Sequence, residues 1–207
     1  AIYLATYFGK SLKSTWTLFN RSAFDHQDKL FSYPRIKKNE LNYYNHLERI
    51  DLFSQVSYSN HRKYTKKSLY GTKGVFHSMD YLINNVNKFC FKRAVKFDVI
   101  YNQALSIPNF GRMAAFDFTS SLSKTNLHVA EPQSMYHKHS TGPLKALDLI
   151  LRLSKTDKRS KSDQVRFGND LLDWFFQNTS IYMTAQVIED AICNWQKSPI
   201  KYYRFFG

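Results

Sequence analysis

Acidic and histidine side chains near the middle of the chain could transfer protons. Glu131 lies close in sequence to three histidines, His128, His137 and His139. An imidazole gains and loses a proton near neutral pH, so this group is suited to acid–base chemistry. Three histidines also suggest a metal site, but no carboxylates at metal-ligand spacing accompany them, and we predict no metal.

A second candidate acid lies slightly earlier in the chain. Asp117 is flanked by Phe116 and Phe118. A carboxylate between aromatic residues is either a buried hydrogen-bonding group or a group that faces a cleft, and the sequence allows both. The catalytic candidates are therefore Glu131, Asp117 and His137.

Residues 107–115, Ile-Pro-Asn-Phe-Gly-Arg-Met-Ala-Ala, predict a tight turn between two helices. Pro108 prevents the first helix from continuing, and Asn109 and Gly111 tolerate a sharp reversal. The amides of residues 110–112 would then face outward at a helix N-terminus, where the dipole favours an anion such as a DNA phosphate. A purely structural turn explains the same residues. The predicted DNA contacts are Asn109, Phe110, Gly111 and Arg112.

The elements around this turn are predicted to be helical, and the fold class is all-α. Apolar residues recur at spacings of three and four, which is typical of amphipathic helices. The stretches with this spacing are 76–90, 97–105, 144–151, 171–176 and 187–195. We expect a single helical domain over residues 1–207, with its core at about 95–195. The N-terminal portion, residues 1–70, has a poorly phased pattern.

The charge indicates a polyanionic partner. Lys and Arg total 30 against 16 acidic residues, a net charge of +14, and nucleic acid is the usual partner of such a chain. A lineage with lysine-rich proteins would explain the charge without a partner. The apolar fraction of 43% is enough for a packed core.

The sequence also bears on the cellular compartment. No apolar run reaches the length of a membrane span, and the first residues do not have the pattern of a signal peptide. Cys90 and Cys193 lie far apart within apolar helical patterns, which predicts reduced, buried thiols. We therefore expect a cytoplasmic protein with no membrane partner.

The turn resembles the Leu-Pro-Gly-Val-Gly-x-x-Thr-Ala hairpin of the helix-hairpin-helix DNA glycosylase superfamily. This resemblance implies a glycosylase-like helical fold with a cleft between two lobes, and a monovalent cation bound at the hairpin. In those glycosylases a catalytic aspartate follows the second glycine by about twenty residues, and this spacing implies Glu131 as the acid or base. Bifunctional members have a lysine where this chain has Met113, which argues against lyase chemistry.

Further motifs are similar to a phage group derived from these glycosylases, the α-glutamyl/putrescinyl-thymine pyrophosphorylases or amino acid:DNA transferases. The motifs are Gly-Arg-Met-Ala-Ala-Phe-Asp-Phe (111–118), Glu-Pro-x-Ser-Met-Tyr (131–136), Ser-Thr-Gly-Pro-Leu-Lys (140–145) and Glu-Asp-Ala-x-Cys (189–193). The resemblance covers roughly residues 95–195. It implies an enzyme that acts on double-stranded DNA in an infected bacterium, alongside a hydroxymethyluracil DNA kinase. The enzyme would displace phosphate or pyrophosphate from activated 5-hydroxymethyluracil with an amino acid or polyamine.

This reaction needs groups that hold the leaving phosphates and a pocket for the base. Arg112 and two lysines flank the motifs and could bind phosphate oxygens. A turn before Pro143 opens a helix, so it is either a simple N-cap or a second anion site, or both. The leaving-group candidates are Lys138, Ser140, Thr141, Gly142 and Lys145. Tyr136 is the candidate for stacking on the base, although an aromatic residue in an aromatic-rich chain is more often part of the core. Glu189 and Asp190 are expected on the solvated face of the last helix, and no tightly bound cofactor is expected.

Two other functional hypotheses fit the same sequence. The chain could be a monofunctional DNA glycosylase in which Glu131 activates water, or a non-catalytic DNA-binding subunit of a larger assembly. An accessory role beside a hydroxymethyluracil DNA kinase also fits. The chain lacks a glycine-rich phosphate loop followed by lysine, so it is not itself that kinase.

Overall fold

The computed structural model describes residues 17–53, 75–91, 93–125, 127, 129–155 and 160–201. Regular structure in these ranges is helical and includes no β-strand beyond two isolated bridges, Phe24–Leu30 and Val95–Val129, which confirms the all-α prediction. The α-helices are α2 (Thr17–Ala23), α3 (Tyr33–Lys38), α4 (Glu40–Phe53), α5 (Val75–Asn84), α6 (Phe97–Leu105), α7 (Arg112–Lys124), α8 (Gly142–Leu153), α9 (Lys161–Asn178) and α10 (Ala185–Trp195). Two short 3-10 helices are η2 (Val86–Phe89) and η3 (His137–His139).

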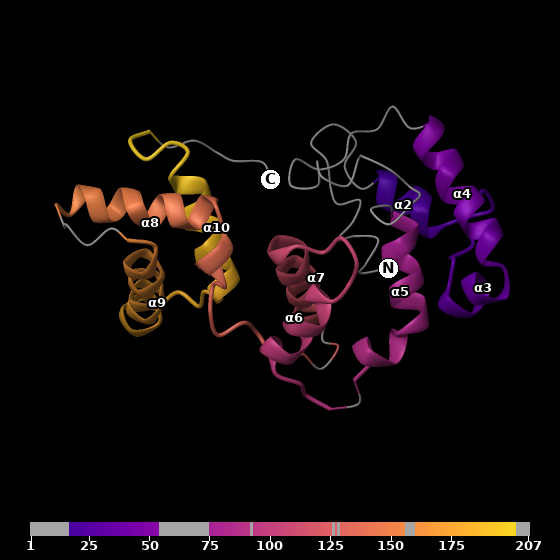
Figure 1. Ribbon diagram of the computed structural model, residues 1–207, viewed down its shortest axis with the longest axis horizontal. Helices are drawn as coiled ribbons and strands as arrows, with labels where there is room; N and C mark the ends of the chain where they lie inside the picture. Colours follow the sequence, from indigo (N-terminus) through magenta and orange to yellow (C-terminus); the bar gives the residue numbers. More distant parts are fainter. Residues whose placement is uncertain are drawn as a thin grey trace.

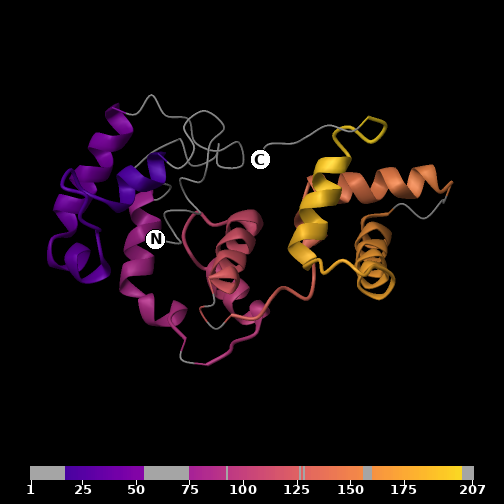
Figure 2. The same ribbon diagram turned by 180° about the vertical axis from the view of Figure 1, so that it is seen from behind.

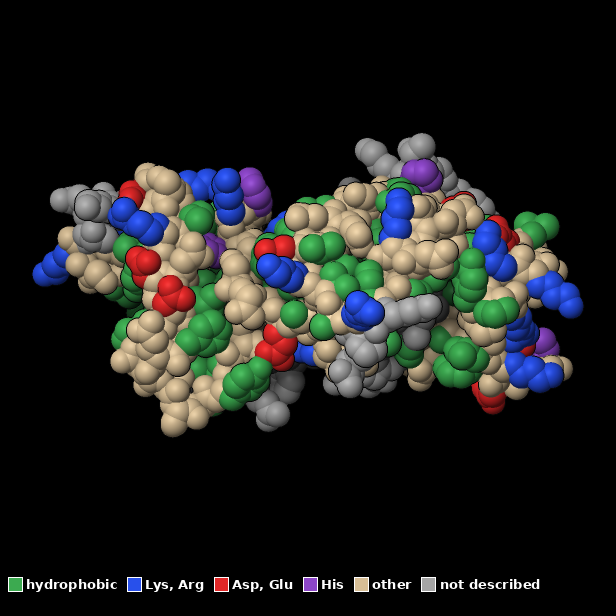
Figure 3. All heavy atoms as spheres, turned by 90° about the horizontal axis from the view of Figure 1, so that it is seen from below, with side chains coloured by type: hydrophobic (Ala, Val, Ile, Leu, Met, Phe, Trp, Pro, Cys, Tyr) green, Lys and Arg blue, Asp and Glu red, His purple; other side chains and the backbone are tan. Residues whose placement is uncertain are grey.

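The helices form three groups along the long axis of the molecule, as Figures 1 and 2 show from opposite sides. We call them the N-terminal lobe (α2–α5), the hairpin lobe (η2, α6 and α7) and the C-terminal lobe (η3 and α8–α10). Each lobe has its own cluster of buried hydrophobic residues. In the space-filling view the surface is hollowed between the C-terminal lobe and the hairpin lobe (Figure 3).

The N-terminal lobe contains most of the poorly phased stretch. Its core relies on aromatic residues, because Tyr43 on α4 is completely buried and packs on Phe31 with ring centroids 4.7 Å apart. The Tyr43 hydroxyl donates a hydrogen bond to the Ser22 carbonyl at 3.1 Å, which satisfies its polar end. Tyrosines in core positions blur the apolar period from which helices are read.

The hairpin lobe is built on the contact between α6 and α7. Ala104, Ala114 and Ala115 are at most 3% exposed, and their small side chains let the two helices approach closely. The helices end and begin at Leu105 and Arg112, as the Pro108 turn predicts.

The C-terminal lobe packs α8 against α9 and α10, and Gly168 on α9 permits a close approach to η3. A Cβ atom at Gly168 would lie 2.3 Å from Nε2 of His137 and 2.8 Å from Cδ1 of Leu147. Both neighbours are fully buried, so neither has room to move.

We therefore expect Gly168→Ala to destabilise the protein, although alanine is the better helix former by about 1 kcal/mol. The added methyl group overpacks the contact, and the net loss should be on the order of 1–3 kcal/mol in the free energy of unfolding. Urea titration followed by circular dichroism measures it. A stabilised Gly168→Ala variant would show that α9 and His137 are not packed as closely as the structure indicates.

Two further predictions concern the compartment. Within the described ranges no helix is both long and apolar enough to cross a membrane. The prediction of two buried thiols is wrong for Cys90, which is exposed, whereas Cys193 is half-buried. Helix α5 ends at Asn84 and the chain turns through η2, so Cys90 no longer lies on the apolar face of a helix.

Candidate functional site at the junction of the hairpin and helix α10

The hairpin turn is fixed from outside by helix α5. Asn109 has a left-handed backbone with φ of 66°, as predicted for the turn, and its side-chain amide donates to Oγ of Ser78 at 3.3 Å. Ser78 is completely buried and its hydroxyl donates to the Pro108 carbonyl at 2.5 Å. Sequence patterns did not point to Ser78, because a single serine within an apolar helix forms no motif.

Other predicted DNA contacts at the turn differ in their accessibility. Phe110 is buried and packs edge-on against Phe118, and its amide donates to the Ile107 carbonyl at 3.0 Å. Gly111 is exposed, and no side chain caps the start of α7 there. The carbonyls of Ile107 and Pro108 already accept hydrogen bonds. The monovalent cation at the hairpin stays a prediction.

Gly111 offers a clean test of phosphate binding at the N-terminus of α7. Its φ of −86° suits any residue, and an added Cβ would meet nothing within 4 Å. We expect Gly111→Val to fold but to block a phosphate from the α7 amides, weakening duplex DNA binding by on the order of tenfold in fluorescence anisotropy. Gly111→Ala, with its smaller side chain, should weaken binding less. Unchanged affinity of a folded Gly111→Val protein would remove the hairpin from DNA contact.

Arg112, at the start of α7, connects the hairpin lobe to the C-terminal lobe. Its Nε donates to the Tyr136 carbonyl at 2.8 Å and its Nη2 donates to the Met135 carbonyl at 2.7 Å. Nη2 also forms an ion pair with Oε1 of Glu189 on α10 at 2.8 Å. The Arg112 and Glu189 side chains are only 12% and 9% exposed, so the pair lies just beneath the surface. The guanidinium also lies over the Phe116 ring, 5.2 Å from its centroid.

The surroundings of Glu189 favour its protonated form. Burial is the largest cause of a rise in the pKa of Glu189 to about 7, a net value that includes the opposing effect of Arg112 and smaller upward contributions from the negative charges of Asp190 and Asp117. Asp117 is half-buried on α7 and Asp190 is exposed on α10. A carboxyl with a pKa near neutrality can both accept and release a proton at physiological pH.

The start of α8 packs against α10 near Glu189. A Cβ atom at Gly142 would lie 2.3 Å from Sγ of Cys193, which follows Glu189 by one helical turn. All four motif stretches, 111–118, 131–136, 140–145 and 189–193, are therefore brought together at this junction.

The expectation that Glu189 lies on a solvated face is wrong. Glu189 is 7% exposed and shares a helix face with Ala185, Ile188 and Ile192, which are also buried. Positions four residues apart lie on the same side of a helix, so Glu189 falls within the apolar stripe that Ala185 begins. An acid at an apolar position was the signal in the sequence that could have identified it.

Glu131, the predicted acid or base, lies elsewhere on the boundary between the lobes. Its side chain is exposed and accepts a hydrogen bond from the hydroxyl of Tyr182, in the loop before α10. Among the described residues, Glu131 forms no hydrogen bond or ion pair with Arg112 or Glu189. Its catalytic role stays a prediction.

His137 is buried in the C-terminal lobe. Its Nε2 donates to the Val165 carbonyl at 2.9 Å, and burial lowers the pKa of the ring, so the imidazole is neutral at physiological pH. Nδ1 is buried and has no partner in the described part of the chain. His139 is exposed, and His128 lies outside the described residues. A role for His137 in proton transfer stays a prediction.

The leaving-group candidates flank the start of α8. Ser140 is buried and its hydroxyl donates to the His137 carbonyl at 2.8 Å, so it does not cap α8; Thr141 holds the cap position without a side-chain hydrogen bond. Lys138, Thr141 and Lys145 are exposed. Phosphate binding by this group stays a prediction.

Tyr136 is held in an aromatic cluster. Its backbone is left-handed, with φ of 50°, and its ring lies 4.3 Å from that of Tyr101, 5.3 Å from Phe97 and 5.7 Å from Phe116. The ring is half-buried in the core of the hairpin lobe. Stacking on a DNA base stays a prediction.

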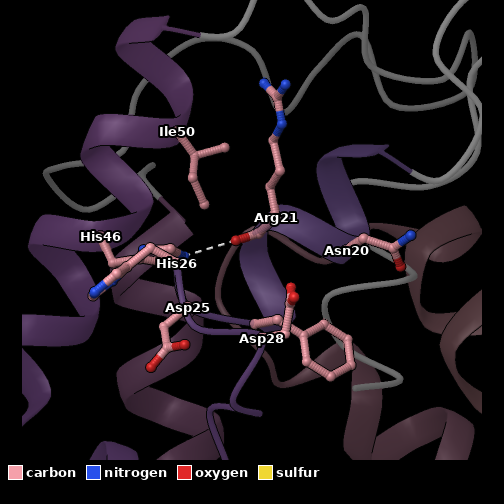
Figure 4. A pocket seen from close by; sticks show the side chains of 8 residues that line it. Asn20, Arg21, Asp25, His26, Asp28, His46 and Ile50 are labelled. Atoms are coloured by element: carbon pink, nitrogen blue, oxygen red, sulfur yellow. Dashed lines mark hydrogen bonds between the residues drawn. The ribbon is translucent and has the colours of Figure 1, made fainter.

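A pocket of about 290 Å³ lies in the N-terminal lobe, away from this junction (Figure 4). His46 donates there from Nε2 to the Arg21 carbonyl at 2.7 Å. None of the predicted site residues lines the pocket. Its lining residues are Asn20, Arg21, Phe24, Asp25, His26, Asp28, His46 and Ile50. Across the described residues, no three His, Cys, Asp or Glu side chains are arranged to hold a metal ion.

The fold and the site together define an all-helical protein. An arginine that follows the turn between α6 and α7 forms a buried ion pair with a glutamate of the C-terminal lobe. The family model of the alpha-glutamyl/putrescinyl thymine pyrophosphorylases, clade 3, matches residues 1–207. The chain belongs to this family, which confirms the family predicted from the motifs. The match extends beyond residues 95–195 to the whole chain. No curated protein and no solved structure matches it.

Proposed function

We propose that this protein transfers an amine onto 5-hydroxymethyluracil in double-stranded DNA after that base has been activated as a phosphate or pyrophosphate ester. DNA hypermodification of the thymine pyrophosphorylase type is what the family name indicates. The amine nitrogen bonds to the exocyclic methylene carbon, and the bond from that carbon to the phosphate oxygen breaks. The oxygen keeps the electron pair, and the amine gives up a proton.

The buried Arg112–Glu189 pair carries this proposal. Glu189 accepts the proton of the attacking amine, because its pKa of about 7 leaves a substantial fraction deprotonated at neutral pH. The nitrogen Nη1 of Arg112 has no hydrogen-bond acceptor among the described residues, and it can donate to the departing phosphate.

Other groups have supporting roles in the same scheme. The exposed Lys138 and Lys145 and the turn before α8 bind the leaving phosphates, and Gly111 with the start of α7 binds a DNA phosphate. The amine donor is an amino acid or a polyamine. A separate hydroxymethyluracil DNA kinase supplies the activated base.

Mass spectrometry of the reacted DNA tests the activity. Duplex DNA with phosphorylated or pyrophosphorylated 5-hydroxymethyluracil is incubated with the protein and a mixture of amino acids and polyamines, and the digested nucleosides are weighed. A nucleoside carrying one added amine is the expected product, and its mass identifies the donor. Abasic sites would instead establish a glycosylase, and bound but unaltered DNA would favour a non-catalytic subunit.

A further inference from the structure

Residue contacts connect two segments at the boundary between the hairpin lobe and the C-terminal lobe in two places. Residues 131–136 precede η3, and residues 182–189 enter α10. Tyr182 donates its hydroxyl to Glu131, and Arg112 connects the carbonyls of Met135 and Tyr136 to Glu189. The first residues of the two segments are therefore joined to each other, and their last residues meet at the proposed site.

The ring of Tyr182 is unusually accessible for an aromatic side chain that is held in place. Tyr182 is 81% exposed, and the neighbouring Ile181 is 69% exposed. Water normally leaves such a ring free to rotate, but its hydroxyl is tied to Glu131. A fixed ring with open faces has lost part of its conformational entropy before any ligand arrives, which favours binding. Tyr136, by contrast, is already packed against three rings.

We propose that Tyr182 is the residue on which the target pyrimidine stacks when it leaves the DNA helix. Enzymes that act on a base in a duplex extrude it and often hold it against an aromatic side chain. The tyrosine lies on the lobe boundary, and its loop leads directly into the helix that carries Glu189. Glu131 then positions the Tyr182 ring through its hydroxyl. This inference rests on the proposed function for the identity of the base but not for the stacking itself.

The test uses a duplex with 5-hydroxymethyluracil beside 2-aminopurine, whose fluorescence rises when its neighbour unstacks. No amine is added, so no transfer takes place. We expect the wild-type protein to raise the fluorescence. Tyr182→Phe keeps the ring but loses the hydrogen bond that positions it, so it should retain most of the rise. Tyr182→Ala should lose the rise and bind the duplex about 5- to 100-fold more weakly.

Tyr33→Ala is the matched control. Tyr33 is another exposed tyrosine with a single hydrogen bond, from its hydroxyl to the Ile83 carbonyl, but it lies in the N-terminal lobe. The Tyr33→Ala variant should give the same fluorescence rise as the wild-type protein. Thermal melting checks that each variant is folded.

Three results would overturn the inference: no fluorescence rise with the wild-type protein, a normal rise with Tyr182→Ala, or equal losses in Tyr182→Phe and Tyr182→Ala. The last would mean that the hydroxyl, not the ring, matters. A Tyr182-dependent rise here, together with no aminated nucleoside in the separate mass-spectrometry experiment, would support the inference and refute amine transfer.

Discussion

Glu189→Gln is expected to reduce amine transfer by about 10²- to 10⁴-fold, the usual contribution of a general base. Glutamine keeps the size of the side chain and can still accept a hydrogen bond from Arg112, but it cannot take a proton. The rate of aminated nucleoside formation, followed by mass spectrometry, measures the loss. The wild-type kcat/KM should rise with pH up to about 7, because Glu189 must lose its proton to act as a base. The variant should lack this rise.

Substitutions of two other carboxylates serve as a control and as a test of the competing base. Glu40→Gln changes a surface ion pair with Lys37 in the N-terminal lobe and should leave transfer unaffected. Glu131→Gln tests the base that the spacing of the motif implied. An inactive Glu131→Gln protein beside an active Glu189→Gln protein would assign the proton transfer to Glu131 and refute the role of Glu189.

Arg112→Met should be among the most destabilising substitutions in the chain, with an expected loss of about 3–5 kcal/mol in the free energy of unfolding. Methionine has a similar length, but it leaves the Glu189 carboxylate buried without a partner and two carbonyls without a donor. Urea titration at pH 8, where Glu189 of the wild-type protein is mostly charged and paired with Arg112, measures the loss. The double variant Arg112→Met/Glu189→Gln should recover part of the loss.

The surface pair Arg166–Asp163 provides the control. Its nitrogen–oxygen distance is 3.2 Å and its arginine is 64% exposed, so Arg166→Met should cost less than about 1 kcal/mol. If Arg112→Met costs no more than Arg166→Met, the pair does not hold the two lobes together.

Local sequence patterns predicted much of this structure. The Pro108–Gly111 turn, the helix from Arg112 and the left-handed Asn109 follow from the backbone preferences of proline, glycine and asparagine. The motifs also led to the family, although they covered only half of its match. The helices of residues 17–53 were expected only as part of an all-α chain and without bounds, because the buried Tyr43 takes a core position and blurs the apolar period.

The helical class, the turn between α6 and α7 and the family could thus be predicted from sequence, since they depend on neighbouring residues and local periodicity. Three features depend on how the helices pack: Arg112 binds Glu189 and not the solvent, Ser78 holds the turn, and Tyr136 is packed while Tyr182 is exposed. Glu189 lies 77 positions after Arg112 in the numbering of the chain, and no local preference reports a contact over that distance. Burial, which raises the pKa of Glu189 and makes it a candidate base, is a property of the folded chain and not of the residues next to Glu189 in sequence.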